Sequence, residues 1–207
     1  MKALLNRGTS ALAIILLPIL FFSCSSNTNH DPSLYLEYAG DAKNGLIQSI
    51  SYNDIDISLK LIPSNYFLLK DNALDILNKT MIYDLKEDYA HSLYFMLDVS
   101  PKRKSNKIID RNTFDIEEFK RKTQGLNFNL EQLVSIKING NDLYPVLSSL
   151  QNVYELDGSK SILLAFQLEQ ILDTDIKCSF DDKLFTGETF EFTFLKADFD
   201  NIPQLSI

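Results

Sequence analysis

The sequence has no tryptophan, two cysteines and two histidines among its 207 residues. Beyond Cys24 there is only Cys178, so the folded part cannot form an internal disulfide. His30 lies in a polar segment near the N-terminus, which leaves His91 as the one histidine of the presumed domain. No zinc constellation can be built from this set, and a Ser-His-Asp hydrolase is disfavoured because the Gly-x-Ser-x-Gly motif is also missing.

Basic residues and long apolar runs are also scarce. The chain has 20 Lys and Arg against 28 Asp and Glu, a formal net charge of −8. Nucleic acids and anionic lipids are bound through basic surfaces, so neither is expected as a partner. The uncharged run at residues 11–22 contains Pro18 and is shorter than the roughly 20 apolar residues of a membrane-spanning helix.

The N-terminus has the features of a secretory signal. Lys2 and Arg7 precede the apolar run, which ends in Phe21-Phe22-Ser23-Cys24. This ending resembles the lipobox of bacterial lipoproteins, in which a small residue precedes a cysteine that becomes lipidated. Ser23 fits the small position, whereas Phe21 and Phe22 depart from the usual aliphatic or small residues. An ordinary secretory peptide, leaving Cys24 as a plain thiol, is the alternative.

The resemblance implies a diacylglycerol and an N-acyl chain on Cys24, with no other cofactor. Several acyl chains together anchor a protein stably. Ser25 stands where an Asp would resemble an inner-membrane retention signal, so the expected location is the outer membrane, on its periplasmic face or at the cell surface. The expected organisation is a signal peptide at 1–23, the lipidated Cys with a flexible tether at 24–33, and one domain at 34–207. Loss of Lys2 and Arg7 makes the mature chain two charges more negative.

Period-two alternation dominates the rest of the chain and indicates half-buried strands. Residues 55–61 place Ile and Leu on one face, residues 134–138 place Val and Ile there, and residues 190–194 place Phe there. Hairpin turns are expected at Asn53-Asp54, Asn139-Gly140 and Asp157-Gly158. Residues 92–99 are apolar on both faces and predict a central strand, while Pro145 predicts an edge or irregular link. Together these patterns predict an antiparallel β-sandwich, immunoglobulin-like or transthyretin-like.

One short helix is predicted at residues 116–124. Asp115 is suited to its N-cap, and Glu118, three residues after Asp115, completes a capping box. Gly125 is expected to end the helix. Residues 65–69 suggest a short strand, and 71–78 a helical turn.

No catalytic or metal-binding residue is identified. Cys178 alternates with Ile176 and Phe180, which predicts a buried structural thiol. Acidic pairs at 87–88 and 181–182 are interpreted as solvated charges near turns, and acids at 173–175 and 198–201 lack the order of a calcium loop. The residues to consider for binding are two tyrosines that could stack on sugars and four residues of a basic loop: Tyr144, Tyr154, Lys102, Arg103, Lys104 and Lys107.

The favoured function is a non-catalytic, membrane-anchored lipoprotein that binds another envelope protein or forms part of an envelope assembly. In layout it is similar to the small sandwich lipoproteins that join secretion machines to the outer membrane. Two alternatives stay open: a glycan-binding or solute-binding surface lipoprotein, and a small hydrolase that uses a carboxylate pair.

Overall fold

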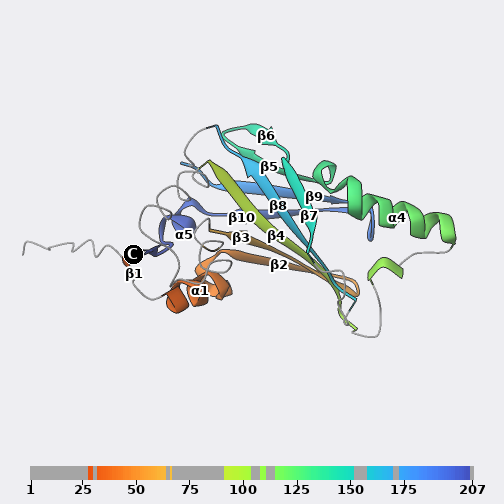
Figure 1. Cartoon of the computed structure of the whole chain (residues 1–207), viewed down its shortest axis with the longest axis horizontal. Coiled ribbons are helices and arrows are strands. Elements are labelled where there is room, and N and C mark those ends of the chain that lie inside the picture. Colours follow the sequence, from red (N-terminus) through yellow and green to blue (C-terminus); the bar gives the residue numbers. More distant parts are fainter. Residues whose placement is uncertain are drawn as a thin grey trace, which may run out of the picture.

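The protein is an antiparallel β-sandwich with few helices, as the alternation predicts (Figure 1). The computed structural model describes residues 28–29, 32–63, 66, 91–103, 108–110, 115–151, 158–169 and 173–205. One sheet has the order β2-β3-β4-β8-β7 and the other β10-β9-β5-β6. The five strands of the first are β2 (Ile47–Tyr52), β3 (Ile55–Ile62), β4 (Ser92–Pro101), β8 (Lys160–Gln167) and β7 (Leu147–Leu150). The four strands of the second are β10 (Glu188–Phe194), β9 (Ile176–Asp182), β5 (Val134–Ile138) and β6 (Asn141–Leu143).

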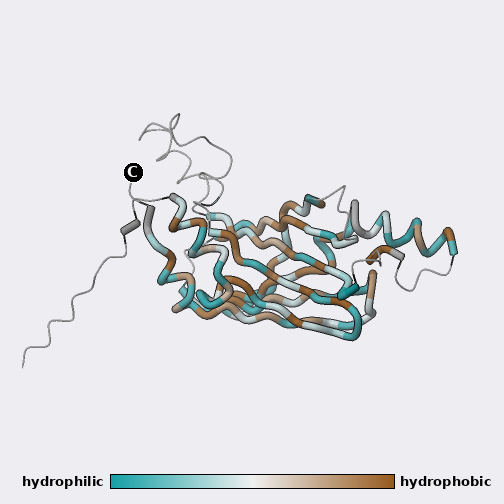
Figure 2. Tube along the Cα trace, turned by 90° about the horizontal axis from the view of Figure 1, so that it is seen from below, coloured by the Kyte–Doolittle hydropathy of each residue, from teal (hydrophilic) through white to brown (hydrophobic). Residues whose placement is uncertain are grey.

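The core lies between the two sheets, and along β4, β9 and β10 buried side chains alternate with more exposed ones. Figure 2 shows hydrophobic residues along the strands of the sandwich. Phe95 of β4 is fully buried and contacts Phe194 of β10, with ring centroids 5.4 Å apart. Phe166 packs edge-on against Phe95 at 5.7 Å. Burial of each such side chain stabilises the fold by roughly 1.5–3 kcal/mol, so the alternating stripes hold the sheets together.

The expected turns and the central strand are confirmed where the structure describes them. Asn53 and Asn139 have positive φ angles of 51° and 52° in the β2–β3 and β5–β6 hairpins. β4 is the middle strand of its sheet, although its second face, with Tyr94 and Met96, is only half-buried. The chain passes from one sheet to the other through Pro145, and β7 follows as an edge strand. The expected elements at 65–69 and 71–78 and the Asp157-Gly158 turn fall wholly or partly outside the described residues.

The predicted helix exists but is longer than expected. It is α4 (Ile116–Phe128), and Asp115 caps it by accepting a hydrogen bond from the Glu118 amide at 2.8 Å. Gly125 does not end the helix, which is a correction to the sequence prediction. A Cβ at Gly125 would lie 2.5 Å from a methyl group of Leu184, so this glycine allows the helix to pack closely on the β9–β10 turn.

Further short helices border the sandwich. α1 (Pro32–Gly40), the turn η1 (Ala42–Asn44) and α5 (Lys196–Asp200) gather at one end, away from α4 (Figure 1). Two more 3-10 turns, η2 (Ile108–Asp110) and η3 (Leu130–Gln132), flank α4. Among the described residues no helix has the length and apolar character needed to cross a membrane.

Part of the segment 24–33, expected from the sequence to be a flexible tether, has regular structure. β1 (Thr28–Asn29) pairs in parallel with β11 (Gln204–Leu205), and α1 begins at Pro32. Proline is favoured at the first helical position. Within the predicted domain, Tyr35 and Ala39 of α1 are each 1% exposed, so this helix packs against the end of the sandwich.

Candidate functional site

The outward side chains of the four-stranded sheet line a hollow of about 480 Å³. They alternate with the buried core residues of the same strands, so the pattern that builds the core also builds this surface. β5 and β9 lie in its middle, with β6 and β10 at its borders. We call it the sheet-face hollow, and its outward residues are Ser135, Lys137, Asp142, Tyr144, Lys177, Ser179, Glu191 and Thr193.

The strand register places two lysines at directly opposed positions in the hollow. Lys137 of β5 is the direct partner of Lys177 of β9, and Ser135 is the partner of Ser179 one pleat away. Like charges at directly opposed positions destabilise a sheet. Lys137 Nζ has a carboxylate oxygen of Asp142 at 3.5 Å, and both side chains are about half exposed, at 53% and 55%. Within the described part of the chain, Lys177 has no ion-pair partner.

Tyr144, which the sequence analysis selected as a candidate binding residue, forms one wall of the hollow. Its side chain is 60% exposed, and it follows directly after β6. Pro145 comes next and cannot extend the ladder, so the ring stands at the border of the sheet. Its companion from the sequence, Tyr154, lies outside the described residues.

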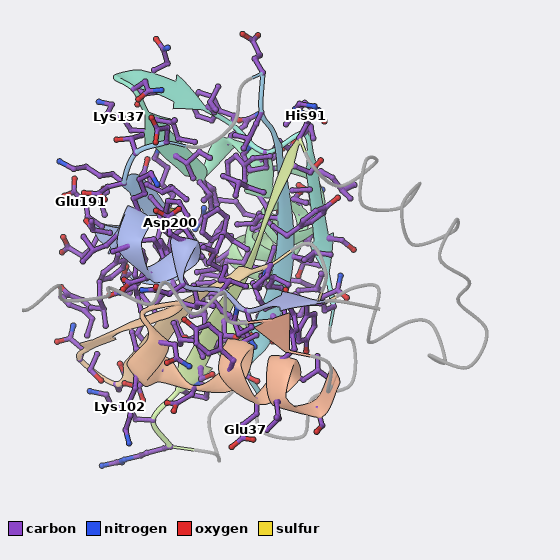
Figure 3. All side chains as sticks on the ribbon, turned by 90° about the vertical axis from the view of Figure 1, so that its left-hand side faces the viewer. Glu37, His91, Lys102, Lys137, Glu191 and Asp200 are labelled. Carbon is purple, nitrogen blue, oxygen red and sulfur yellow. The ribbon has the colours of Figure 1, made fainter. Side chains whose placement is uncertain are left out.

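The acids of the hollow are far apart. Asp142 belongs to β6 and Glu191 to β10, at opposite borders of the sheet (Figure 3 labels Lys137 and Glu191 on this face). Three strand spacings place their backbones about 14 Å apart. Glycosidases hold their two carboxyl groups roughly 5 to 9.5 Å apart, so this pair gives the hydrolase alternative no support.

A second surface lies at the crossover between the sheets. Val146 is 69% exposed and Leu147 is 54% exposed, at the start of β7. β7 has the sequence Leu-Ser-Ser-Leu without a charged residue, and among the described strands it pairs with β8 alone. We call Val146, Leu147 and the outer side of β7 the β7 edge surface.

Of the basic loop the structure describes Lys102 and Arg103, and Lys102 lies well apart from Lys137 (Figure 3). Lys102 Nζ donates to the carbonyl of Asn53 at 2.8 Å, and the Lys102 amide donates to the carbonyl of Asp54 at 2.8 Å. Lys102 therefore fastens the β2–β3 turn, and Arg103 beside it is exposed. Lys104, Lys107 and Cys24 lie outside the described residues.

The C-terminal acidic segments are organised by a lysine. Lys196 Nζ contacts the carboxylates of Asp200 and Asp173, the latter at 3.8 Å, and the Lys196 amide donates to Asp175 at 2.8 Å. The hydrogen bond to Asp200 raises the pKa of Lys196; desolvation acts in the opposite direction, and the negative charges of Asp200 and Asp173 add to the increase. The ammonium group of Lys196 thus lies against both acidic segments, 173–175 and 198–201. The described residues contain no group of three or more acids, histidines or cysteines arranged for a metal.

Asp182 was misread as a solvated charge. It is fully buried, and its carboxylate accepts hydrogen bonds from the amides of Leu184, Phe185 and Thr186 at 3.2, 3.0 and 3.0 Å, and from the Thr186 hydroxyl at 2.8 Å. The carbonyl of Asp182 also accepts from the amide of Gly187 at 2.8 Å. Its place two and three residues before the bonded amides is typical of an Asx turn, which was the available sequence signal.

Two further sequence interpretations concern reactive groups. Cys178 is 2% exposed on the core face of β9, and burial raises the pKa of its thiol to about 12. The interpretation as a buried structural thiol is confirmed. His91 is exposed where β4 begins, and its carbonyl accepts from the Leu168 amide at 2.7 Å.

The chain matches no family model and no curated protein. Two solved structures are similar in outline. One is a protein of unknown function from Burkholderia pseudomallei, with 10% identity and a TM-score of 0.36 over 77% of this chain and 84% of that one. The other is a DUF4426 family protein from Pseudomonas aeruginosa, with 12% identity and a TM-score of 0.33 over 72% of this chain and 92% of that one.

Proposed function

We propose that this protein is a lipid-anchored, non-catalytic component of the bacterial cell envelope that binds another envelope protein. Cys24 carries the lipid and holds the sandwich at the outer membrane. The sandwich itself is a rigid body that presents a binding edge, and no chemical step is assigned to it.

The observation that carries the proposal is the β7 edge surface. Edge strands of natural sheets are commonly protected by charged residues, proline or bulges, because their free amides and carbonyls pair readily with other chains. The Ser148 hydroxyl of β7 donates to the Glu131 carboxylate at 3.1 Å, so one charged group from η3 lies against this strand. Both edge strands of the sheet, β2 and β7, lack charged residues of their own, but Ile47 and Ile50 of β2 are half-buried, whereas Val146 and Leu147 are 69% and 54% exposed. This combination suits a partner that adds an extended segment beside β7 and covers the two apolar side chains.

Site-specific photocrosslinking in living cells tests the partner. A photoreactive phenylalanine analogue is placed at Val146 and, as a matched control, at Ser49 on the exposed edge strand β2. We expect a discrete crosslinked adduct from position 146 only, and its loss when Leu147→Lys is added. Absence of an adduct at 146, or the same adduct from both positions, contradicts the proposal.

The anchor is tested separately. In the Cys24→Ser variant the thiol that would be acylated is missing, so the protein is expected in the soluble fraction after membranes are sedimented. Retention of that variant on membranes, at the level of the unaltered protein, would show that the anchor has been assigned wrongly.

A further inference from the structure

We propose that the sheet-face hollow binds an oligosaccharide in which one carboxylate-bearing sugar is attached to neutral sugar rings. This site goes beyond the proposed protein-binding function, because it lies on a different sheet from the β7 edge surface. The two can therefore be tested independently.

The charge pattern of the hollow calls for an anionic group. Lys137 and Lys177 are direct cross-strand partners in a chain whose acids outnumber its bases by 28 to 20. An acid at either position would form a favourable pair, whereas two lysines repel each other. The nearby Asp142 compensates Lys137 only through a solvent-exposed contact at 3.5 Å, which contributes little. A carboxylate lying between the two ammonium groups would be held by both and would remove their repulsion.

The groups around the two lysines fit a sugar chain. Ser135 and Ser179 are partners in the adjacent row and offer hydroxyl donors and acceptors beside the ammonium groups. Tyr144 provides an exposed ring on which the apolar face of a sugar can stack. Glu191 and Thr193, on the opposite border strand, are suited to sugar hydroxyls. The hollow thus combines charge recognition in its centre with polar and aromatic contacts at its borders.

The same residues disfavour other occupants. A protein interface has an apolar centre, but the only exposed large apolar side chain of the hollow is Tyr144. A polyanion such as a nucleic acid would meet Asp142 and Glu191 at the two borders, and these repel phosphates. An oligosaccharide with an isolated carboxylate avoids both conflicts.

Calorimetric titration of the full-length lipidated protein in detergent tests the site. The probes are two pairs of oligosaccharides that differ in the acidic group: 3′-sialyllactose with lactose, and an aldotetraouronic acid with xylotetraose. We expect at least one acidic probe to bind about tenfold more tightly than its neutral counterpart, with an affinity that falls as salt is added. Binding of neither acidic probe, or equal binding of each acidic probe and its neutral counterpart, would overturn the proposal.

Four variants locate the binding. Lys177→Ala and Tyr144→Ala are each expected to weaken the acidic probe about tenfold, because each removes a principal contact. Lys102→Ala and Phe119→Ala are their matched controls, since they remove an exposed lysine and an exposed aromatic side chain outside the hollow. The proposal is wrong if Lys177→Ala binds as tightly as the unaltered protein, or if Lys102→Ala weakens binding equally. Absence of a crosslinked adduct from position 146 would contradict the protein-binding proposal but would not change the measured sugar affinity. The two proposals can therefore fail independently.

Discussion

Asp182 shows how a single buried carboxylate shapes a turn. It satisfies three amides and a hydroxyl between β9 and β10, and all four hydrogen bonds lie within five consecutive residues. Removing the carboxylate leaves the amides of Leu184 and Phe185 buried without an acceptor, and such groups each cost on the order of 1–3 kcal/mol.

We therefore expect Asp182→Ala to lower the free energy of unfolding by about 3 kcal/mol in urea denaturation. The free energy of unfolding of Asp182→Asn should lie between those of the unaltered protein and Asp182→Ala, because the single carbonyl oxygen of asparagine can replace part of the acceptor capacity. Asp181→Ala is the neighbouring control. Asp181 forms an exposed ion pair with Lys183 at 2.6 Å, so its loss should change stability by less than about 1 kcal/mol. Equal losses for Asp181→Ala and Asp182→Ala would refute this role.

Cys178 predicts a specific dependence of stability on alkaline pH. Its folded pKa is raised to about 12, whereas a thiol in the unfolded chain ionises near pH 8.5. Above that pH the unfolded chain loses a proton that the native protein keeps, so the stabilising contribution is complete at neutral pH and is lost as pH rises toward the folded pKa. The stability difference between the unaltered protein and Cys178→Ala should shrink by about 1.4 kcal/mol per pH unit above pH 9. Urea denaturation at pH 8, 9 and 10 measures it, and a constant difference would contradict the prediction.

Because Cys178 is the one other cysteine of the chain, counting reactive thiols tests whether Cys24 carries a lipid. A maleimide reagent at neutral pH should leave Cys178 unmodified in the native protein, because the side chain is 2% exposed and un-ionised. After unfolding in urea, mature protein with lipid on Cys24 should take up one maleimide, as read by mass spectrometry. Uptake of two would identify Cys24 as a plain thiol.

At the scale of elements, Gly45 lies at the contact between η1 and α5, two elements from opposite ends of the chain. It ends η1 with a φ of +76°, and a Cβ on it would lie 2.2 Å from a carboxylate oxygen of Asp198 in α5. Gly140, in the β5–β6 turn, has a similar φ of +83° but nothing within 4 Å of its Cβ position. A substitution at Gly140 therefore tests backbone strain alone, whereas the same substitution at Gly45 tests backbone strain together with close packing.

Gly140→Ala should lower the free energy of unfolding by about 1–2 kcal/mol, the cost of left-handed backbone for a residue with a Cβ. Gly45→Ala should cost a further 1–3 kcal/mol or so, because α5 must also move. Adding Asp198→Ala to Gly45→Ala should recover most of the difference in thermal or urea unfolding. Equal effects of the two single variants would show that α5 does not pack tightly on this turn.

The two ends of helix α4 differ in whether neighbouring or distant residues determine them. Its start depends on Asp115 and the amide of Glu118, three residues apart, and was correctly predicted. Its end was predicted wrongly because Gly125 serves a different purpose: it leaves room for the side chain of Leu184, a residue far along the chain. α1 was missed for a similar reason, since its buried Tyr35 and Ala39 depend on packing at the end of the sandwich.

For the whole molecule, the short N-terminal segment has a consequence for orientation. Three residues, 25–27, separate Cys24 from β1, and the four Cα–Cα steps from Cys24 to Thr28 reach at most about 14 Å. If Cys24 carries the proposed lipid, the end of the sandwich with β1, β11 and α5 faces the membrane, and the β9–β10 turn points away (Figure 1).

Fluorescence quenching by headgroup-labelled lipids tests this orientation. A fluorophore on Lys43→Cys, beside α1, should be quenched several-fold more than one on Lys183→Cys, in the β9–β10 turn; both positions are exposed. Cys178 is too buried to interfere with labelling. Equal quenching would mean that the sandwich has no fixed orientation, and the reverse order would contradict the prediction outright.

Alternation along the chain was enough to predict the β-sandwich, the hairpins at Asn53 and Asn139, the burial of Cys178 and the edge character after Pro145. These features depend on side-chain direction and turn conformation over a few neighbouring residues, which a linear pattern records. The meeting of Lys137 with Lys177, the burial of Asp182 and the contact of Gly45 with Asp198 were decided by tertiary structure alone. They depend on the register and packing of segments distant in sequence, or on the depth at which a turn is buried, and no local pattern carries that information.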